Sequence, residues 1–261
     1  MVTFFRKHAE SFFAVAIVVI GAFLRLYRIA DYMTFLGDEG RDVLVVYNIL
    51  HGHLTLLGPT ASVGGFFFGP IYYYFMTPFL WLFNYNPVGP AVMVALFGTA
   101  TIFLVYKVGK IFFNGKVGLI AAFFYAISPV IISYSRSSWN PNPLPFFSIL
   151  TILFIYKGLL EKKIKYLFLA GISLGIAMEL HFVTLFLGSV VFLYVLCMWL
   201  FNNKGFKTNQ IEVLIKQYIF IFLGFFIGWI PYLGFEVRHG FPNTRSILAF
   251  IFQSGKVSGG S

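Results

Sequence analysis

Residues 11–42 read SFFAVAIVVIGAFLRLYRIADYMTFLGDEGRD, and this stretch sets the fold class. It begins with an apolar run over 11–29 and ends in an acidic cluster. About 20 apolar residues cross the hydrocarbon core of a bilayer, so the run predicts a membrane-spanning helix. Three of the nine acidic residues of the chain, Asp38, Glu39 and Asp42, follow it directly. Carboxylates beside a membrane are costly unless they are solvated, paired or functional, so the cluster marks a candidate site.

The whole chain has the composition of a membrane protein. Of its 261 residues, 59% are hydrophobic, 21% are aromatic and 11% are charged, and the mean hydropathy is +0.85. Soluble domains carry about 25% charged residues. We therefore predict an all-α, polytopic transmembrane helical bundle with about seven spans. The predicted spans are 11–29, 88–106, 117–134, 144–160, 165–182, 184–201 and 217–235.

The net charge of +10 comes largely from lysines in short loops between the predicted spans. Such loops are typical of the cytoplasmic side, so the charge indicates topology rather than a nucleic-acid partner. We expect a cytoplasmic N-terminus and a location in the cell (plasma or inner) membrane. The first span lacks a cleavage site and is expected to stay as an anchor. With the single Cys197, disulfides play no part.

Residues 66–83 form one further apolar stretch, interrupted by a glycine and two prolines. If it crossed the membrane, every later lysine-rich loop would change side. We predict an interfacial or re-entrant helix within a long first outer loop over 30–87. Backbone of this kind is buried in protein or lines a cavity, so the loop is expected to build a site. We expect 1–261 to form a single domain with a flexible tail over 246–261.

Arginines and lysines separate on this map, because six of the seven arginines lie on the outer side or near the outer ends of spans. A guanidinium group binds phosphate through two hydrogen bonds, whereas lysine acts as a point charge. Arg25 and Arg28 fit interface anchors equally well. Arg136 lies in a short polar loop, where phosphate binding is the stronger interpretation.

The outer segments gather carboxylates, histidines, arginines and aromatic residues. Carboxylates deprotonate hydroxyl groups or bind divalent cations, and aromatic rings stack on sugars. The pattern suggests a polar, anionic or sugar-like substrate, although Glu179 and His181 fit a buried polar pair equally well. No Cys/His cluster or phosphate-binding Gly-rich loop is present, which argues against a nucleotide-driven enzyme. The candidate substrate-binding residues are Arg41, Tyr72, Tyr73, Trp139, Asn140, Glu179, His181 and His239.

Several motifs together make the chain resemble the GT-C superfamily of integral-membrane glycosyltransferases. The similarity is to the glycosyltransferase family 39-like set, which includes protein O-mannosyltransferases and lipid A aminoarabinose transferases. It covers essentially the whole chain. The motifs are Phe35-Leu36-Gly37-Asp38-Glu39, Gly69-Pro70-Ile71-Tyr72-Tyr73, Leu104–Phe112, Ala126-Ile127-Ser128-Pro129 and Ser133-Tyr134-Ser135-Arg136.

The resemblance implies transfer of a sugar from a polyprenyl-phosphate-linked donor to a protein, lipid or glycan acceptor on the extracytoplasmic face. It places the catalytic acid of the first loop on Asp38 or Glu39, as acceptor base or metal ligand. It places the donor-phosphate contact on Arg136, and we add Arg238 and Arg245 as further candidates.

Two departures from the family qualify these expectations. Many members have an aspartate a few residues after the arginine that Arg136 matches, where this chain has Asn140 and Asn142. This departure argues against a metal site with two carboxylates, and a divalent metal ion at Asp38 and Glu39 is left open. The chain is also shorter than usual members, so we expect a truncated form. A lipid-linked-sugar transporter or flippase, and an O-antigen ligase or polymerase, remain alternatives. The acidic pair in a long first loop and the lack of an internal repeat favour the glycosyltransferase.

Overall fold

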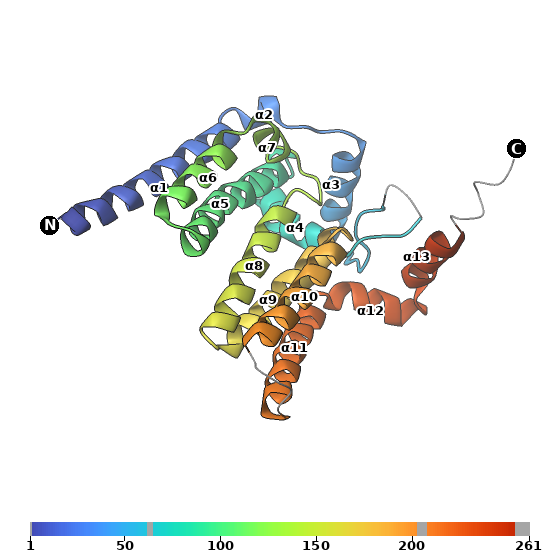
Figure 1. Cartoon of the computed structure of the whole chain (residues 1–261). Coiled ribbons are helices and arrows are strands. Elements are labelled where there is room, and N and C mark those ends of the chain that lie inside the picture. Colours follow the sequence, from blue (N-terminus) through green and yellow to red (C-terminus); the bar gives the residue numbers. More distant parts are fainter. Residues whose placement is uncertain (1, 62–64, 203–207, 254–261) are drawn as a thin grey trace, which may run out of the picture.

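The chain forms a helical bundle, and the computed structural model describes residues 2–61, 65–202 and 208–253. These residues hold thirteen helices and no strand, which confirms the predicted all-α fold. In Figure 1, α1, α5 and α6 lie side by side in one group, and α8 to α11 form a second. The helices are α1 (Val2–Leu26), α2 (Ile29–Tyr32), α3 (Gly37–Leu50), α4 (Ile71–Leu82), α5 (Val88–Phe112), α6 (Gly115–Ile127), α7 (Pro129–Tyr134), α8 (Leu144–Leu160), α9 (Ile164–Leu180), α10 (Thr184–Asn202), α11 (Thr208–Gly228), α12 (Ile230–His239) and α13 (Pro242–Gln253).

Four helices in the described residues are long and apolar enough to cross a membrane. They are Ala9–Leu26 in α1, Val88–Phe112 in α5, Thr184–Phe201 in α10 and Gln210–Gly228 in α11. The spans predicted over 144–160 and 165–182 coincide with the shorter helices α8 and α9, and α6 covers the first part of the span predicted over 117–134. The multi-pass helical architecture thus follows the predicted map. The tail predicted over 246–261 begins within α13, and 254–261 lie outside the described residues.

Two predicted spans are interrupted in the structure. The span predicted over 117–134 becomes α6 and α7, and the span predicted over 217–235 becomes the end of α11 and the first part of α12. Each second helix carries a proline in its first turn, Pro129 in α7 and Pro231 in α12. Proline lacks an N–H and clashes with the preceding turn, so a continuous helix is broken there. As a result, α12 turns away from α11 in Figure 1.

Arg25 is fully buried rather than placed at an interface. Its Nη1 and Nη2 donate to the carbonyls of Ala126 at 3.0 Å and Tyr125 at 3.2 Å, and its Nε donates to Ser135 Oγ at 3.3 Å. Carbonyls in the last turn of a helix have no partner within it. Arg25 therefore ties α1 to the end of α6 and to the residue that follows α7.

Glycines allow α9 and α11 to approach closely. A Cβ on Gly171 would lie 2.1 Å from Ile221 O, and one on Gly228 would lie 2.3 Å from Ile172 O. Small residues let helix backbones come near each other in membranes. These glycines therefore fix α11 against α9, on the side from which α12 begins.

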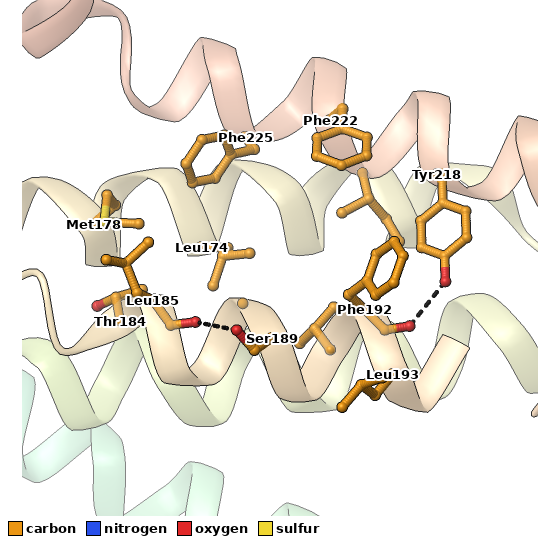
Figure 2. Close-up of a pocket in the computed structure, with 13 residues that line it drawn as sticks. Leu174, Met178, Thr184, Leu185, Ser189, Phe192, Leu193, Tyr218, Phe222 and Phe225 are labelled. Atoms are coloured by element: carbon orange, nitrogen blue, oxygen red, sulfur yellow. Dashed lines mark hydrogen bonds between the residues drawn. The ribbon is translucent and has the colours of Figure 1, made fainter. Parts of the chain in front are cut away.

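An apolar cavity of about 470 Å³ lies between α9, α10 and α11. Figure 2 shows the side chains that line it, which come from all three helices. Its three hydroxyl groups are satisfied internally, because Thr184 donates to Ala177 O, Ser189 to Leu185 O and Tyr218 to Phe192 O. No charged side chain lines this cavity in the part of the chain that is described.

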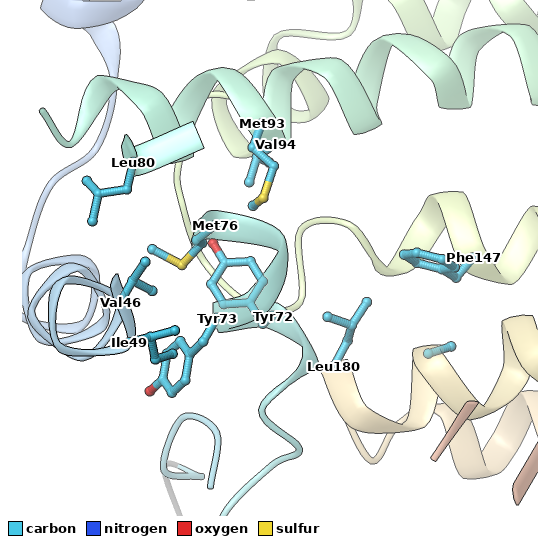
Figure 3. Close-up of a cluster of buried hydrophobic side chains, with 11 residues drawn as sticks. Val46, Ile49, Tyr72, Tyr73, Met76, Leu80, Met93, Val94, Phe147 and Leu180 are labelled. Carbon is cyan, nitrogen blue, oxygen red and sulfur yellow. The ribbon is translucent and has the colours of Figure 1, made fainter. Parts of the chain in front are cut away.

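The first loop is folded onto the bundle rather than free. Figure 3 shows the buried cluster that joins α3 and α4 to α5, α8 and α9. α4 has twelve residues, about 18 Å at 1.5 Å per residue, which is too short for a core of about 30 Å. The interfacial or re-entrant placement expected for this stretch stays a prediction. The cluster consists of Val46, Ile49, Tyr72, Tyr73, Met76, Leu80, Met93, Val94, Phe147, Ala177 and Leu180.

Candidate active site

The acidic pair lies in the first turn of α3, where its two members have different surroundings. Glu39 is buried, and its Oε2 accepts the backbone N–H of Leu36 at 3.0 Å. Its Oε1 accepts the hydroxyl of Ser137 at 2.9 Å. Acidic side chains favour a helix N-terminus because they satisfy free N–H groups and the helix dipole. Glu39 therefore fastens α3 to the loop that follows α7.

Asp38 points to solvent, with its side chain 58% exposed. Its Oδ1 accepts Arg41 Nη1 at 2.9 Å. The other two contacts of Arg41 go to Asp42 Oδ1, from Nε at 3.0 Å and from Nη2 at 2.8 Å. Asp38 is thus an accessible carboxylate that is held on one oxygen by a positioned arginine.

A cavity of about 170 Å³ opens beside Asp38 and Arg41. Four separate segments build it: the start of α3, the loop before α4, the loop after α7 and the turn between α9 and α10. Five of the predicted site residues come together here. The lining residues are Asp38, Arg41, Thr60, Ala61, Phe66, Phe68, Trp139, Asn140, His181 and Phe182.

The aromatic part of this wall was not anticipated from the sequence. Phe68 stacks on His181 with ring centroids 5.0 Å apart, and Phe66 contacts Phe182 edge-on at 5.3 Å. The sequence placed Phe66 and Phe68 within an apolar stretch expected to be a helix, so they did not stand out among 35 phenylalanines. The signal that would have found them is the Gly69-Pro70 pair, which ends the loop before α4.

Glu179 is fully buried and holds two helices instead of pairing with His181. Its Oε2 accepts the N–H of Ile71 at 3.1 Å and its Oε1 accepts the N–H of Tyr232 at 3.0 Å. These groups belong to the first turns of α4 and α12, where N–H groups lack helical partners. A Cβ on Gly69 would lie 2.6 Å from the Glu179 side chain, so this approach requires the glycine. Within the described residues, Glu179 does not line the cavity.

A second buried carboxylate arranges α13 next to the cavity wall. Glu236 accepts the backbone N–H groups of Asn243 at 3.0 Å and Thr244 at 2.9 Å. The Asn243 side chain in turn accepts the N–H of Phe67 at 2.9 Å. The loop that carries the phenylalanines is therefore held by α13, from the far end of the chain.

The two predicted tyrosines support the site from behind. Tyr72 and Tyr73 are buried in α4. The Tyr72 hydroxyl bonds Ser138 Oγ at 2.8 Å, and the Tyr73 hydroxyl donates to Asp42 Oδ1 at 3.1 Å. Neither is among the residues that line the cavity. Their direct contact with substrate, predicted from the sequence, stays a prediction.

The predicted phosphate-binding arginines are not gathered in this cavity. Arg136 donates to the carbonyl of Leu24 and lies over the Tyr32 ring at 4.9 Å, while its buried Nε has no partner in the described residues. Arg238 and Arg245 are exposed on α12 and α13. His239 is exposed too, and its Nδ1 lies 2.9 Å from Phe235 O. Among the predicted cations, Arg41 is the one that reaches the cavity.

Asp42 is the strongly perturbed acid of this region. Burial raises the pKa of its carboxyl to about 6, and the hydrogen bonds from Arg41 and Tyr73 offset only part of that rise. Perturbed carboxyl groups concentrate near functional sites, which makes Asp42 a residue that sequence reasoning underrated.

The described residues contain no group of three or more His, Cys, Asp or Glu side chains that could hold a metal ion. Both Glu39 oxygens already accept hydrogen bonds, and Asp38 Oδ1 accepts one from Arg41. A cation bound by this pair would need ligands from the substrate or water.

The chain is similar to a known protein family over most of its length. A family model described as dolichyl-phosphate-mannose-protein mannosyltransferase matches residues 68–230, which is more than half of the chain. The chain belongs to this family. It is therefore a membrane glycosyltransferase of the GT-C type, as the sequence motifs indicated. A search of curated proteins gives no match. The mannosyltransferase match starts at Phe68, so the acidic start of α3 lies before the matched region.

Proposed function

We propose that the chain transfers a sugar from a polyprenyl-phosphate-linked donor to a hydroxyl or amine of a protein, lipid or glycan acceptor. The observation that carries this proposal is the cavity in which Asp38 and Arg41 face aromatic side chains. Family membership gives the class of reaction. The positions of charged residues suggest that the cavity opens on the extracytoplasmic face, since the lysine-rich loops lie at other segments.

In the proposed reaction, Asp38 is the general base. Its carboxylate takes the proton of the acceptor while the acceptor oxygen or nitrogen bonds to the anomeric carbon of the sugar. The bond between that carbon and the phosphate oxygen breaks, and polyprenyl phosphate leaves. Negative charge grows on the phosphate, which Arg41 at the cavity wall would stabilise.

The aromatic wall supports a sugar in this cavity. Trp139, Phe66 and Phe182 present ring surface, and Asn140 and His181 supply polar groups next to it. Binding sites of this type combine apolar walls with a few placed polar groups that fix orientation. Asn140 is itself held, because its Nδ2 donates to Leu180 O at 2.7 Å.

The apolar cavity of Figure 2 supports a lipid-linked donor. Thr184 and Leu185 line it, whereas His181 and Phe182 line the cavity beside Asp38. The turn between α9 and α10 thus lines the cavity beside Asp38, and the first turn of α10, which follows it directly, lines the apolar cavity. We propose that the apolar cavity takes part of the polyprenyl chain of a donor whose phosphate lies near Arg41.

The test is an assay of membranes that contain the chain, with radiolabelled polyprenyl-phosphate sugars as donors. Label is expected in protein or in lipid-linked material, and the fraction that carries it identifies the acceptor class. An Asp38→Asn protein at equal abundance should lose the transfer. Absence of transfer with every donor, despite inserted and folded protein, would refute the proposed reaction.

A further inference from the structure

Asp42 is buried next to the cavity but touches neither solvent nor the cavity among the described residues. Its side chain is 0% exposed, and it does not line the cavity in the described residues. Its Oδ1 accepts three hydrogen bonds: two from Arg41 and one from the Tyr73 hydroxyl at 3.1 Å. Its Oδ2 is buried with no partner among the described residues. A buried carboxylate is expensive, so its position next to the reaction site requires an explanation.

The contact between Arg41 and Asp42 is unusual for a helix. Adjacent residues of a helix do not face each other. Arg41 therefore folds back to place Nε and Nη2 on Asp42 Oδ1 at 3.0 and 2.8 Å. The Arg41 side chain is long, flexible and 38% exposed. Fixing it in one conformation costs conformational entropy, so without an attractive partner it would extend into water. The buried carboxylate supplies the attraction that keeps it folded.

This conformation of Arg41 determines which of its guanidinium nitrogens faces the cavity. With Nε and Nη2 engaged, Nη1 is the group that reaches Asp38, at 2.9 Å. Both Asp38 and Arg41 line the cavity. Asp42 is itself fixed by α4, because the Tyr73 hydroxyl donates to the same oxygen. A chain of contacts thus runs from buried α4 through Asp42 and Arg41 to the exposed carboxylate.

We infer that Asp42 is a positioning residue, which clamps Arg41 so that its free edge holds Asp38 at the cavity. This inference rests on the proposed function for the role of the cavity, while the clamp itself is a property of α3. Asp42 acts through Arg41 and does not contact substrate.

A double-mutant cycle on kcat/KM tests this action through Arg41. Asp42→Asn is isosteric and should lower kcat/KM at least about tenfold, in line with lost hydrogen bonds between charged groups. In an Arg41→Lys background the same change should cost less than about twofold, because coupled residues are not additive. Glu161→Gln, at an exposed pair with Lys163, is the matched control and should leave kcat/KM unchanged. Equal losses in both backgrounds would show a merely structural role and overturn the inference.

A second measurement does not depend on activity. The Arg41 Nε–H resonance, assigned by its absence in Arg41→Lys, should exchange slowly with water in the wild-type protein in micelles. In Asp42→Asn it should exchange much faster, and unchanged exchange would overturn the clamp. Asp42→Ser removes the carboxylate without adding atoms and replaces Asp42→Asn if that protein does not fold. If the wild-type protein transfers no sugar, the proposed function fails, and the exchange measurement alone decides the clamp.

Discussion

Glu179→Gln should destabilise the protein although it changes little in shape. Both Glu179 oxygens accept backbone N–H groups, one from Ile71 at the start of α4 and one from Tyr232 at the start of α12. The amide of glutamine keeps one acceptor and turns its NH₂ group towards the other N–H. We expect a loss of roughly 1–3 kcal/mol of unfolding free energy, because one buried backbone N–H is left without an acceptor.

The assay is unfolding in mixed micelles with increasing denaturing detergent, followed by tryptophan fluorescence. Trp229 is a suitable reporter, because it stacks on Tyr232 with ring centroids 4.9 Å apart. Glu161→Gln makes the same chemical change at an exposed site and should leave the transition in place. If Glu179→Gln unfolds at the same detergent concentration as Glu161→Gln, the double helix-capping role of Glu179 is wrong.

Four further predictions follow from the site and the topology. Asp38→Asn should lower turnover by roughly 10²–10⁴-fold with the protein still inserted; near wild-type transfer would remove the catalytic role. Arg136→Lys should weaken donor use by roughly 1–3 kcal/mol if the arginine binds phosphate through two hydrogen bonds; wild-type kinetics would leave it with its contacts to Leu24 and Tyr32. Cysteine at position 139 should react with an impermeant reagent on intact cells, while cysteine at position 110 should not; the reverse would overturn the orientation. Because the folded protein raises the Asp42 pKa from 3.8 to about 6, the folded state binds the extra proton between these values. Stability should therefore fall as pH rises from about 4 to 6, by up to roughly 3 kcal/mol, relative to Asp42→Asn measured in parallel.

The residues at the cavity show how far the sequence anticipates which side chains lie near one another. Asp38, Arg41, Trp139, Asn140 and His181 were predicted from polar residue types at the ends of apolar spans, and they line one cavity. The ends of neighbouring spans meet on the same side of a bundle, so topology alone brings such residues near each other. The roles assigned to them remain to be tested by the substitutions above.

The sequence by itself determined that this is a helical membrane protein. Its apolar segments of about 20 residues must satisfy their backbone N–H and C=O groups inside the bilayer, and a helix does this within each segment. It also led to the prediction of an interfacial or re-entrant helix over 66–83, since a further crossing would move every later lysine-rich loop to the other side. Only the tertiary structure decided which acids serve the fold. Glu39 and Glu179 turn inward to backbone and hydroxyl donors, while Asp38 remains exposed. Helical periodicity predicts the face on which a residue lies but not the group that it contacts. The two N–H groups that donate to Glu179 lie 108 and 53 residues away in the chain, so only the packing of the helices brings them to this carboxylate.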